Sequence, residues 1–269
     1  MKLPPQRDDT YSRSLQVPID RDRRFLIFVG AVLVAVALGF KSELLVDSDV
    51  WAFAGGLLLL SVPALLGYLR TGRTLPAVEH YVPAAVGAVA VAGLARLVLE
   101  WWQYVLVALA FGVTFFLSGQ LDYRRLRNQE KPGHVVVQEG LLDISLAAAY
   151  LVILVSPFQI SLKLAWIFVI SLLASYRAFR IFGNPFAPRR AFLFSVFVAQ
   201  VVAFFAWAMS NLDLLREGAV AVMLLLAWYI NRGLVRHTME ETLNRHVLLE
   251  YSVFGFILVL LFVANYQAH

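Results

Sequence analysis

The feature that most constrains this chain is the recurrence of apolar runs, each about 20 residues long, along almost its whole length. Only helices and closed barrels satisfy backbone polar groups in lipid, and these runs are continuous rather than alternating. A helix needs about 20 apolar residues to cross roughly 30 Å of hydrocarbon. Charged residues make up only 15% of the chain, against about 25% in soluble domains. The sequence therefore predicts an all-α polytopic integral membrane protein.

Nine windows are apolar enough to be predicted as spans, and eight is the alternative if two weak segments merge or one is re-entrant. The predicted spans are 25–40, 51–69, 82–100, 103–121, 140–157, 162–182, 191–210, 217–232 and 248–266. Residues 1–24 are polar, and they are too long and too acidic for a signal-peptide n-region. We predict a flexible cytosolic tail there and a single transmembrane domain over 25–269.

Lys and Arg are unevenly distributed between the two sets of predicted loops, which sets the orientation. With the N-terminus in the cytoplasm, most of the 23 Lys and Arg residues lie on that side. The exceptions are Lys41, Arg96, Lys163 and Arg216. We predict a multi-pass protein of a bacterial plasma (inner) membrane with a cytoplasmic N-terminus. The net charge of +5 reports this bias, so we predict no nucleic-acid partner.

The stretch VRHTMEETLNRH (235–246) holds the densest group of ionisable residues between the apolar runs. Its Glu240, Glu241 and Arg245 form an EExxxR element that resembles that of the CAAX-protease-like intramembrane metalloproteases. In that family, later helices carry further histidine motifs. Only one span follows here, and its His269 is predicted on the opposite side of the membrane, so we reject a metal site.

We predict instead that this stretch is one continuous amphipathic helix joining the last two spans, because no Gly or Pro interrupts it. His237, Glu241 and Arg245 then follow each other at intervals of four and form one polar stripe. His246 falls on the opposite face, so a single helix cannot direct both histidines at one metal ion.

Ionisable residues within spans are functional candidates, and there are few here. Arg96 and Glu100 are four apart in the third predicted span, which predicts an intramembrane ion pair on one helix face. Asp143, in the fifth span, lies at the depth of Arg177 and Arg180, at the end of the sixth. We predict an ion pair between Asp143 and one of these arginines, either as a structural lock or as part of a site.

The predicted inner loop at 175–190 contains Arg177, Arg180, Arg189 and Arg190. Arginine guanidinium groups suit phosphate oxygens. These four residues are therefore predicted to bind phosphate or anionic lipid headgroups. The alternative is that the loop is rich in arginine for topology alone.

Several other polar residues are predicted on the cytosolic side, where loops would bring them together: His80 with Glu79, His134, and the stripe that begins at His237. The five histidines all fall in loops or at span ends, which excludes a b-type haem. The chain has no cysteine. We expect no cofactor and no metal.

Three functions remain open. The leading interpretation is a non-catalytic accessory, scaffolding or assembly subunit, with the lipid bilayer and other membrane protein subunits as its partners. The second is an inner-leaflet enzyme acting on a phosphate-bearing lipid or lipid-linked substrate, with Asp143, His80, His237 and Glu241 as candidate catalytic residues. The third is a small transporter, which would need broken helices and polar sites at mid-depth.

Overall fold

The computed structural model describes residues 19–42, 49–69, 77–97, 100–127, 129, 132–182, 186–210 and 216–267. Within these ranges the chain forms nine α-helices and one 3₁₀ turn, with no strand. In chain order they are α1 (Ile19–Ser42), α2 (Asp49–Leu69), η2 (Val78–His80), α3 (Val82–Leu97), α4 (Trp101–Leu126), α5 (Pro132–Val155), α6 (Ile160–Ile181), α7 (Pro188–Ser210), α8 (Glu217–Met239) and α9 (Arg245–Gln267). The prediction of an all-α fold is confirmed.

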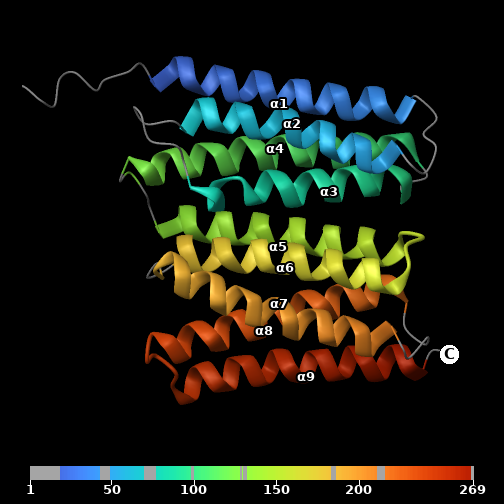
Figure 1. Ribbon diagram of the computed structural model, residues 1–269, viewed down its shortest axis with the longest axis vertical. Coiled ribbons are helices and arrows are strands. Elements are labelled where there is room, and N and C mark those ends of the chain that lie inside the picture. The colour runs from blue at the N-terminus through green and yellow to red at the C-terminus, as the bar shows by residue number, and fades with distance from the viewer. Residues whose placement is uncertain are drawn as a thin grey trace, which may run out of the picture.

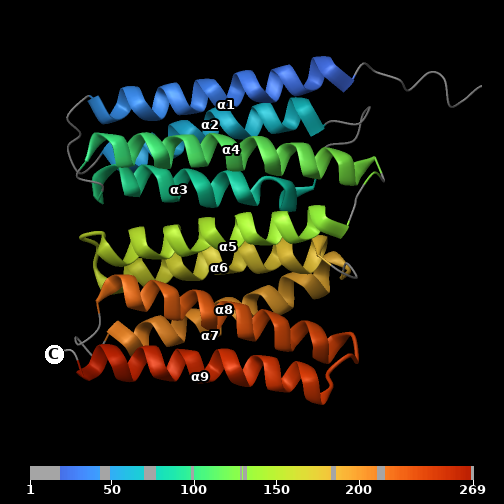
Figure 2. The same ribbon diagram turned by 180° about the vertical axis from the view of Figure 1, so that it is seen from behind.

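Consecutive α-helices run antiparallel, so the helix ends gather at two opposite edges of the bundle (Figures 1 and 2). We call the edge where α1 begins the proximal edge and the opposite one the distal edge. Helices α1 to α4 form one group and α5 to α9 the other, with α3 and α5 facing each other at the junction. The helix α9 lies at the far end and packs against α8.

Seven of the described helices are long and apolar enough to cross a membrane, from the segment that contains α3 to α9. The described parts of α1 and α2 hold shorter apolar segments, Arg24–Gly39 and Ala54–Leu69. The described helices thus have the lengths and composition of a multi-pass membrane protein. The number of nine spans and the cytoplasmic N-terminus stay predictions.

Helix α3 is the centre of the bundle because two of its faces belong to two different hydrophobic cores. Val82, Val86 and Ala90, spaced at helical intervals, join the core built with α5 to α8. Ala84 and Ala88 join the core built with α1, α2 and α4. A helix buried on several sides must be apolar on all of its faces, as residues 82–95 of this one are.

Glycine lets α3 approach its neighbours closely on both sides. A Cβ at Gly87 would meet the ring of Phe111 in α4, and a Cβ at Gly93 would overlap the side chain of Val152 in α5. Small residues bring membrane helices into close contact because dispersion forces need short distances. Gly87 therefore permits close packing within the first helix group, and Gly93 permits it between the two groups.

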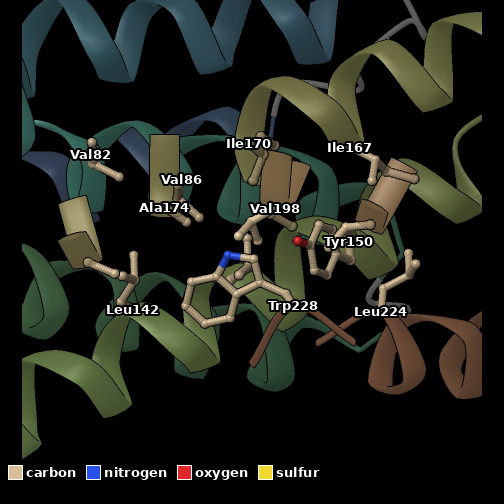
Figure 3. Packing of buried hydrophobic residues seen from close by; sticks show 14 of the residues in the cluster. Val82, Val86, Leu142, Tyr150, Ile167, Ile170, Ala174, Val198, Leu224 and Trp228 are labelled. Atoms are coloured by element: carbon tan, nitrogen blue, oxygen red, sulfur yellow. The ribbon is translucent and has the colours of Figure 1, made fainter. Parts of the chain in front are cut away.

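The larger core is organised around α6, which presents a face of small side chains to two large aromatic residues. Trp228 of α8 donates its indole N–H to Ser175 Oγ at 2.8 Å, and Tyr150 Oη of α5 lies 2.7 Å from Ser171 Oγ. Figure 3 shows both aromatic side chains inside this core, with Ala174 nearby. Their polar atoms are satisfied within it, as burial requires.

The described helices extend beyond the predicted spans at the proximal edge. The interspan segment predicted at 122–139 is largely helical, since α4 continues to Leu126 and α5 begins at Pro132. Helix α1 begins at Ile19, inside the predicted tail, and residues 1–18 lie outside the described residues. A hydropathy pattern indicates only the apolar part of a helix. The polar ends of these helices were therefore predicted as loops.

Candidate functional site

A cluster of six polar side chains lies at the proximal edge, where the two helix groups meet. We call it the proximal network. Four separate elements contribute its members, which are Glu79 and His80 (η2), Asp122 (α4), Gln138 (α5), and Arg177 and Arg180 (α6).

Asp122 is the centre of the proximal network and is completely buried. Arg177 forms two hydrogen bonds with it: Nη2 donates to Oδ1 at 2.9 Å and Nη1 donates to Oδ2 at 3.1 Å. Gln138 Nε2 donates to Oδ1 at 2.6 Å. Two-point pairing of a guanidinium with a carboxylate fixes geometry as well as supplying energy. The charge of Asp122 is therefore balanced by Arg177 of α6, and the neutral amide of Gln138 in α5 adds a hydrogen bond.

The turn η2 is held against the same pair. Arg177 Nη1 also donates to the backbone carbonyl of Glu79 at 2.6 Å. His80 Nδ1 lies 3.2 Å from Asp122 Oδ2, and the imidazole is almost fully buried. His80 Nδ1 forms no hydrogen bond among the described residues, so this contact is an approach of the two groups, and the carboxylate is bound by Arg177.

Arg180 extends the proximal network to the start of α7. Its Nε and Nη2 atoms each lie 3.2 Å from Glu79 Oε1, and its Nη1 donates to the carbonyl of Phe186 at 2.7 Å. Arg177 and Arg180 are three residues apart and so emerge near each other on α6. The two arginines and two carboxylates balance in charge, which buried ions require.

A second polar cluster lies between α5 and α8. Arg232 Nη1 is 3.9 Å from Glu139 Oε1, and the guanidinium carbon lies 4.5 Å from the centre of the Trp228 ring. The buried Oδ1 atom of Asp143 has no hydrogen-bond partner among the described residues. The predicted pairing of Asp143 with Arg177 or Arg180 is therefore wrong, because Asp122 and Glu79 hold those arginines.

The stretch at 235–246 is not one helix. Helix α8 ends at Met239, and Glu241 adopts a left-handed conformation with φ of 54°. Thr242 N–H donates to the carbonyl of His237 at 3.0 Å and Glu241 N–H to that of Thr238 at 3.4 Å. This is the Schellman pattern, which ends helices most often at glycine. The prediction of a continuous amphipathic helix is wrong.

Helix α9 then begins with a conventional N-cap. Asn244 Oδ1 accepts a hydrogen bond from Val247 N–H at 3.0 Å, which satisfies one of the free donors of the first turn. His237 Nδ1 lies 2.8 Å from Thr242 Oγ1 and so bonds within the turn. We call residues 237–246 the α8–α9 hairpin.

The predicted polar stripe does not form in the α8–α9 hairpin. Glu241 sits in the turn and Arg245 on the next helix. The four candidate catalytic residues are therefore distributed over three places. His80 lies in the proximal network, Asp143 beside Arg232, and His237 and Glu241 in the hairpin.

The predicted phosphate-binding arginines divide into two kinds. Arg177 is 1% exposed and bound to Asp122, and its role as a headgroup ligand stays a prediction. Arg180 is bound to Glu79 and Phe186 instead. Arg189 and Arg190 are exposed in the first turn of α7, and their headgroup role stays a prediction.

The remaining residues that were predicted to form polar contacts are Arg96, Glu100 and His134. Helix α3 ends at Leu97 and Glu100 is the N-cap of α4, so Arg96 and Glu100 do not share one helix. The side chain of Arg96 lies outside the described residues, and the ion pair itself stays a prediction. His134 Nε2 lies 3.3 Å from Arg124 Nη1.

Two residues that connect the proximal network, Asp122 and Gln138, were not among the predicted site residues. Both fell in the segment assigned to a loop. One signal was present, since a helix that continues past 121 places Asp122 on the same face as Ser118 and Phe115, both buried. Among the described residues, no group of three or more His, Asp or Glu side chains is placed to hold a metal ion.

The fold and the proximal network together define a multi-pass helical bundle of the membrane type, fastened at one edge by buried ion pairs. Residues 144–265 match the model of a family described as a protein of unknown function (DUF5656). This match covers less than half of the chain and runs from within α5 to within α9. No curated protein and no solved structure matches the chain. Arg177 and Arg180 lie inside the matched segment, whereas Asp122 and Glu79 lie outside it.

Proposed function

We propose that this protein is a non-catalytic multi-pass membrane protein that acts as an accessory, scaffolding or assembly subunit through helix packing in the bilayer. The observation that carries the proposal is the low burial of the apolar helix α9 within its own chain. This helix has the highest mean hydropathy of the seven candidate spans, yet only 6% of its apolar window is buried within the chain. Among the described helices it packs on α8.

The exposed face of α9 carries large apolar side chains, including Leu249, Phe256 and Val259. Helix association in membranes depends on close packing between such surfaces rather than on removing them from water. A helix that adds little to its own core is suited to pack against another subunit. The partner we propose is therefore another membrane protein, with the remaining surface facing lipid.

The proximal network supports a structural rather than a catalytic role. A general acid or base must reach the proton that it transfers. Asp122 is wholly buried and already accepts hydrogen bonds from Arg177 and Gln138. Its carboxylate binds Arg177 and so joins α4 to α6. This arrangement favours a structural role, in which the ion pair fastens the two helix groups to each other.

We further propose that the proximal edge faces the cytoplasm of a plasma membrane. The positive-inside bias supports this orientation. Arg124, Arg125 and Arg127 lie at the end of α4, and Arg189 and Arg190 at the start of α7, all at the proximal edge. The described helix ends at the distal edge carry fewer basic residues, namely Lys41, Arg96, Lys163 and Arg216.

The test is site-specific photocrosslinking in native membranes. A photoreactive amino acid at Phe256 or Val259 of α9 should give a discrete protein adduct, and one at Val113 of α4, which is equally exposed, should not. The adduct mass separates a second copy, which would double the 30.1 kDa chain, from a different subunit. If α9 and α4 positions give only lipid adducts and the purified chain is a monomer, the proposal is wrong.

A further inference from the structure

A half-enclosed cavity of about 310 Å³ opens at the distal edge, between the end of α5, the start of α6, the end of α7 and the start of α8. Its polar side chains are Lys163, Ser210 and Glu217. The cavity is separate from the proximal network, which lies at the opposite ends of α5 and α6.

Lys163 is fixed at the cavity by a helix end. Its Nζ donates to the carbonyl of Leu154 at 2.6 Å, one of the last carbonyls of α5, which have no partner within their own helix. An ammonium group has three N–H donors and no acceptor. With one donor used, two remain to bind an anion beside the cavity.

The opposite charge comes from Glu217, in the first turn of α8. The carboxylate is exposed and forms no ion pair within the part of the chain that the structure describes. It lines the same cavity as Lys163, and the two charges form no salt bridge with each other. The rim therefore offers a cation and an anion at the same time.

The rest of the cavity is apolar. Ile167, Ala206 and Val220, which are nearly or fully buried, line it together with Leu164 and Met209. The helix ends place the polar rim at the depth where headgroups meet the hydrocarbon of a bilayer. A charged rim above an apolar floor matches the layering of a phospholipid.

We propose that this cavity binds one phospholipid whose headgroup carries a primary amine, such as phosphatidylethanolamine. Lys163 binds the phosphate, Glu217 accepts a hydrogen bond from the headgroup ammonium, and the start of an acyl chain lies on the apolar floor. The cavity volume lies at the lower end of the roughly 300–1,000 Å³ of ligand pockets. That is space for about ten water molecules, which suits a headgroup rather than a whole lipid.

The full chain is placed in nanodiscs made of equal amounts of phosphatidylethanolamine and phosphatidylcholine. Native mass spectrometry then measures which lipids stay bound when the protein is released. The wild type should retain one phosphatidylethanolamine in preference to phosphatidylcholine, since a trimethylammonium group has no N–H to donate to Glu217. Lys163→Gln should lower retention of both lipids about tenfold, which corresponds to about 1.4 kcal/mol. Lys163→Arg should keep it.

Glu217→Gln should leave total retention near the wild-type value and abolish the preference between the two lipids. Arg245→Gln removes an exposed charge at the start of α9, at the proximal edge, and serves as the matched control, with retention unchanged. Ala206→Leu, which fills the floor, should exclude the lipid while the protein melts at the wild-type temperature.

A competition with soluble glycerophosphoethanolamine separates the two sources of this headgroup chemistry. Millimolar concentrations of this compound should fail to displace the lipid, because it has no acyl chain to contact the apolar floor of the cavity. Displacement by the soluble compound would assign the site to a free phosphate ester and overturn the lipid proposal. Equal retention of the two lipids by the wild type, or wild-type retention by Lys163→Gln, would also overturn it.

Discussion

The proximal network and the α8–α9 hairpin lie at the same edge of the bundle and have similar compositions, yet their surroundings are opposite. Each combines glutamate, histidine and arginine within a short reach. In the proximal network, Asp122 and Arg177 are almost entirely buried and bind each other, whereas Glu241 in the hairpin is exposed. The difference shows that the crossing of helices, rather than local composition, decides where a charge becomes structurally important.

The largest effect should follow from removing the central carboxylate of the proximal network. Asp122→Ala leaves Arg177 buried without its partner, which should cost about 3–5 kcal/mol. Thermal unfolding in detergent measures it as a large fall in Tm. His237→Ala in the hairpin serves as the control and should cost less than about 1 kcal/mol. Equal effects from the two substitutions would remove the distinction between the regions.

The next largest effect should come from Gln138, which donates to Asp122 at 2.6 Å. Gln138→Ala removes a hydrogen bond to a charged group and should cost about 1.5–3 kcal/mol. Thermal unfolding under the same conditions is the measurement. A wild-type Tm would show that Arg177 alone satisfies the carboxylate.

In the hairpin, the most important side chain should be Asn244, the N-cap of α9. Asn244→Ala should cost about 1 kcal/mol, and the loss should be local, since only the first turn of α9 depends on it. Hydrogen exchange should show faster exchange of the Val247 amide and unchanged exchange in α5 and α6. Faster exchange throughout the bundle would contradict this local role.

The smallest effect should be favourable. Glu241 has a φ of 54°, where a side chain is strained and glycine is not. Glu241→Gly should therefore raise the free energy of unfolding by up to about 1 kcal/mol. Glu240→Gly, at the preceding position with φ of −86°, is the control and should give no gain. A loss of stability from Glu241→Gly would mean that its side chain makes a contact that matters.

Much of the architecture was predictable because lipid imposes helices of a known length. The long apolar runs from α3 onward correspond to helices. The polar ends of the helices were not predictable from hydropathy. Asp122 is an example, because it is charged yet lies within α4 and is buried beside Arg177 of α6. That burial depends on which helices meet, and residues 55 apart in sequence give no local sign of it.

The prediction of one continuous helix through the hairpin was wrong for a different reason. We expected a helix to need Gly or Pro to end, but Glu241 occupies the left-handed position that glycine usually fills. Asn244, directly before α9, was a usable N-cap signal in the sequence. Of the candidate residues, His80 lies beside Asp122, a partner that was not predicted, and its role in a site stays a prediction.

A double-mutant cycle on Asp122 and Arg177 tests most directly whether the proximal network is a structural lock. The free energy of unfolding would be measured for Asp122→Leu, Arg177→Met and the double variant in the same detergent. Each single variant should lose about 3–5 kcal/mol, because it leaves one buried charge unpaired. The double variant should lose less than the sum by at least about 2 kcal/mol. Additive losses within about 0.5 kcal/mol, or single variants as stable as the wild type, would contradict the lock.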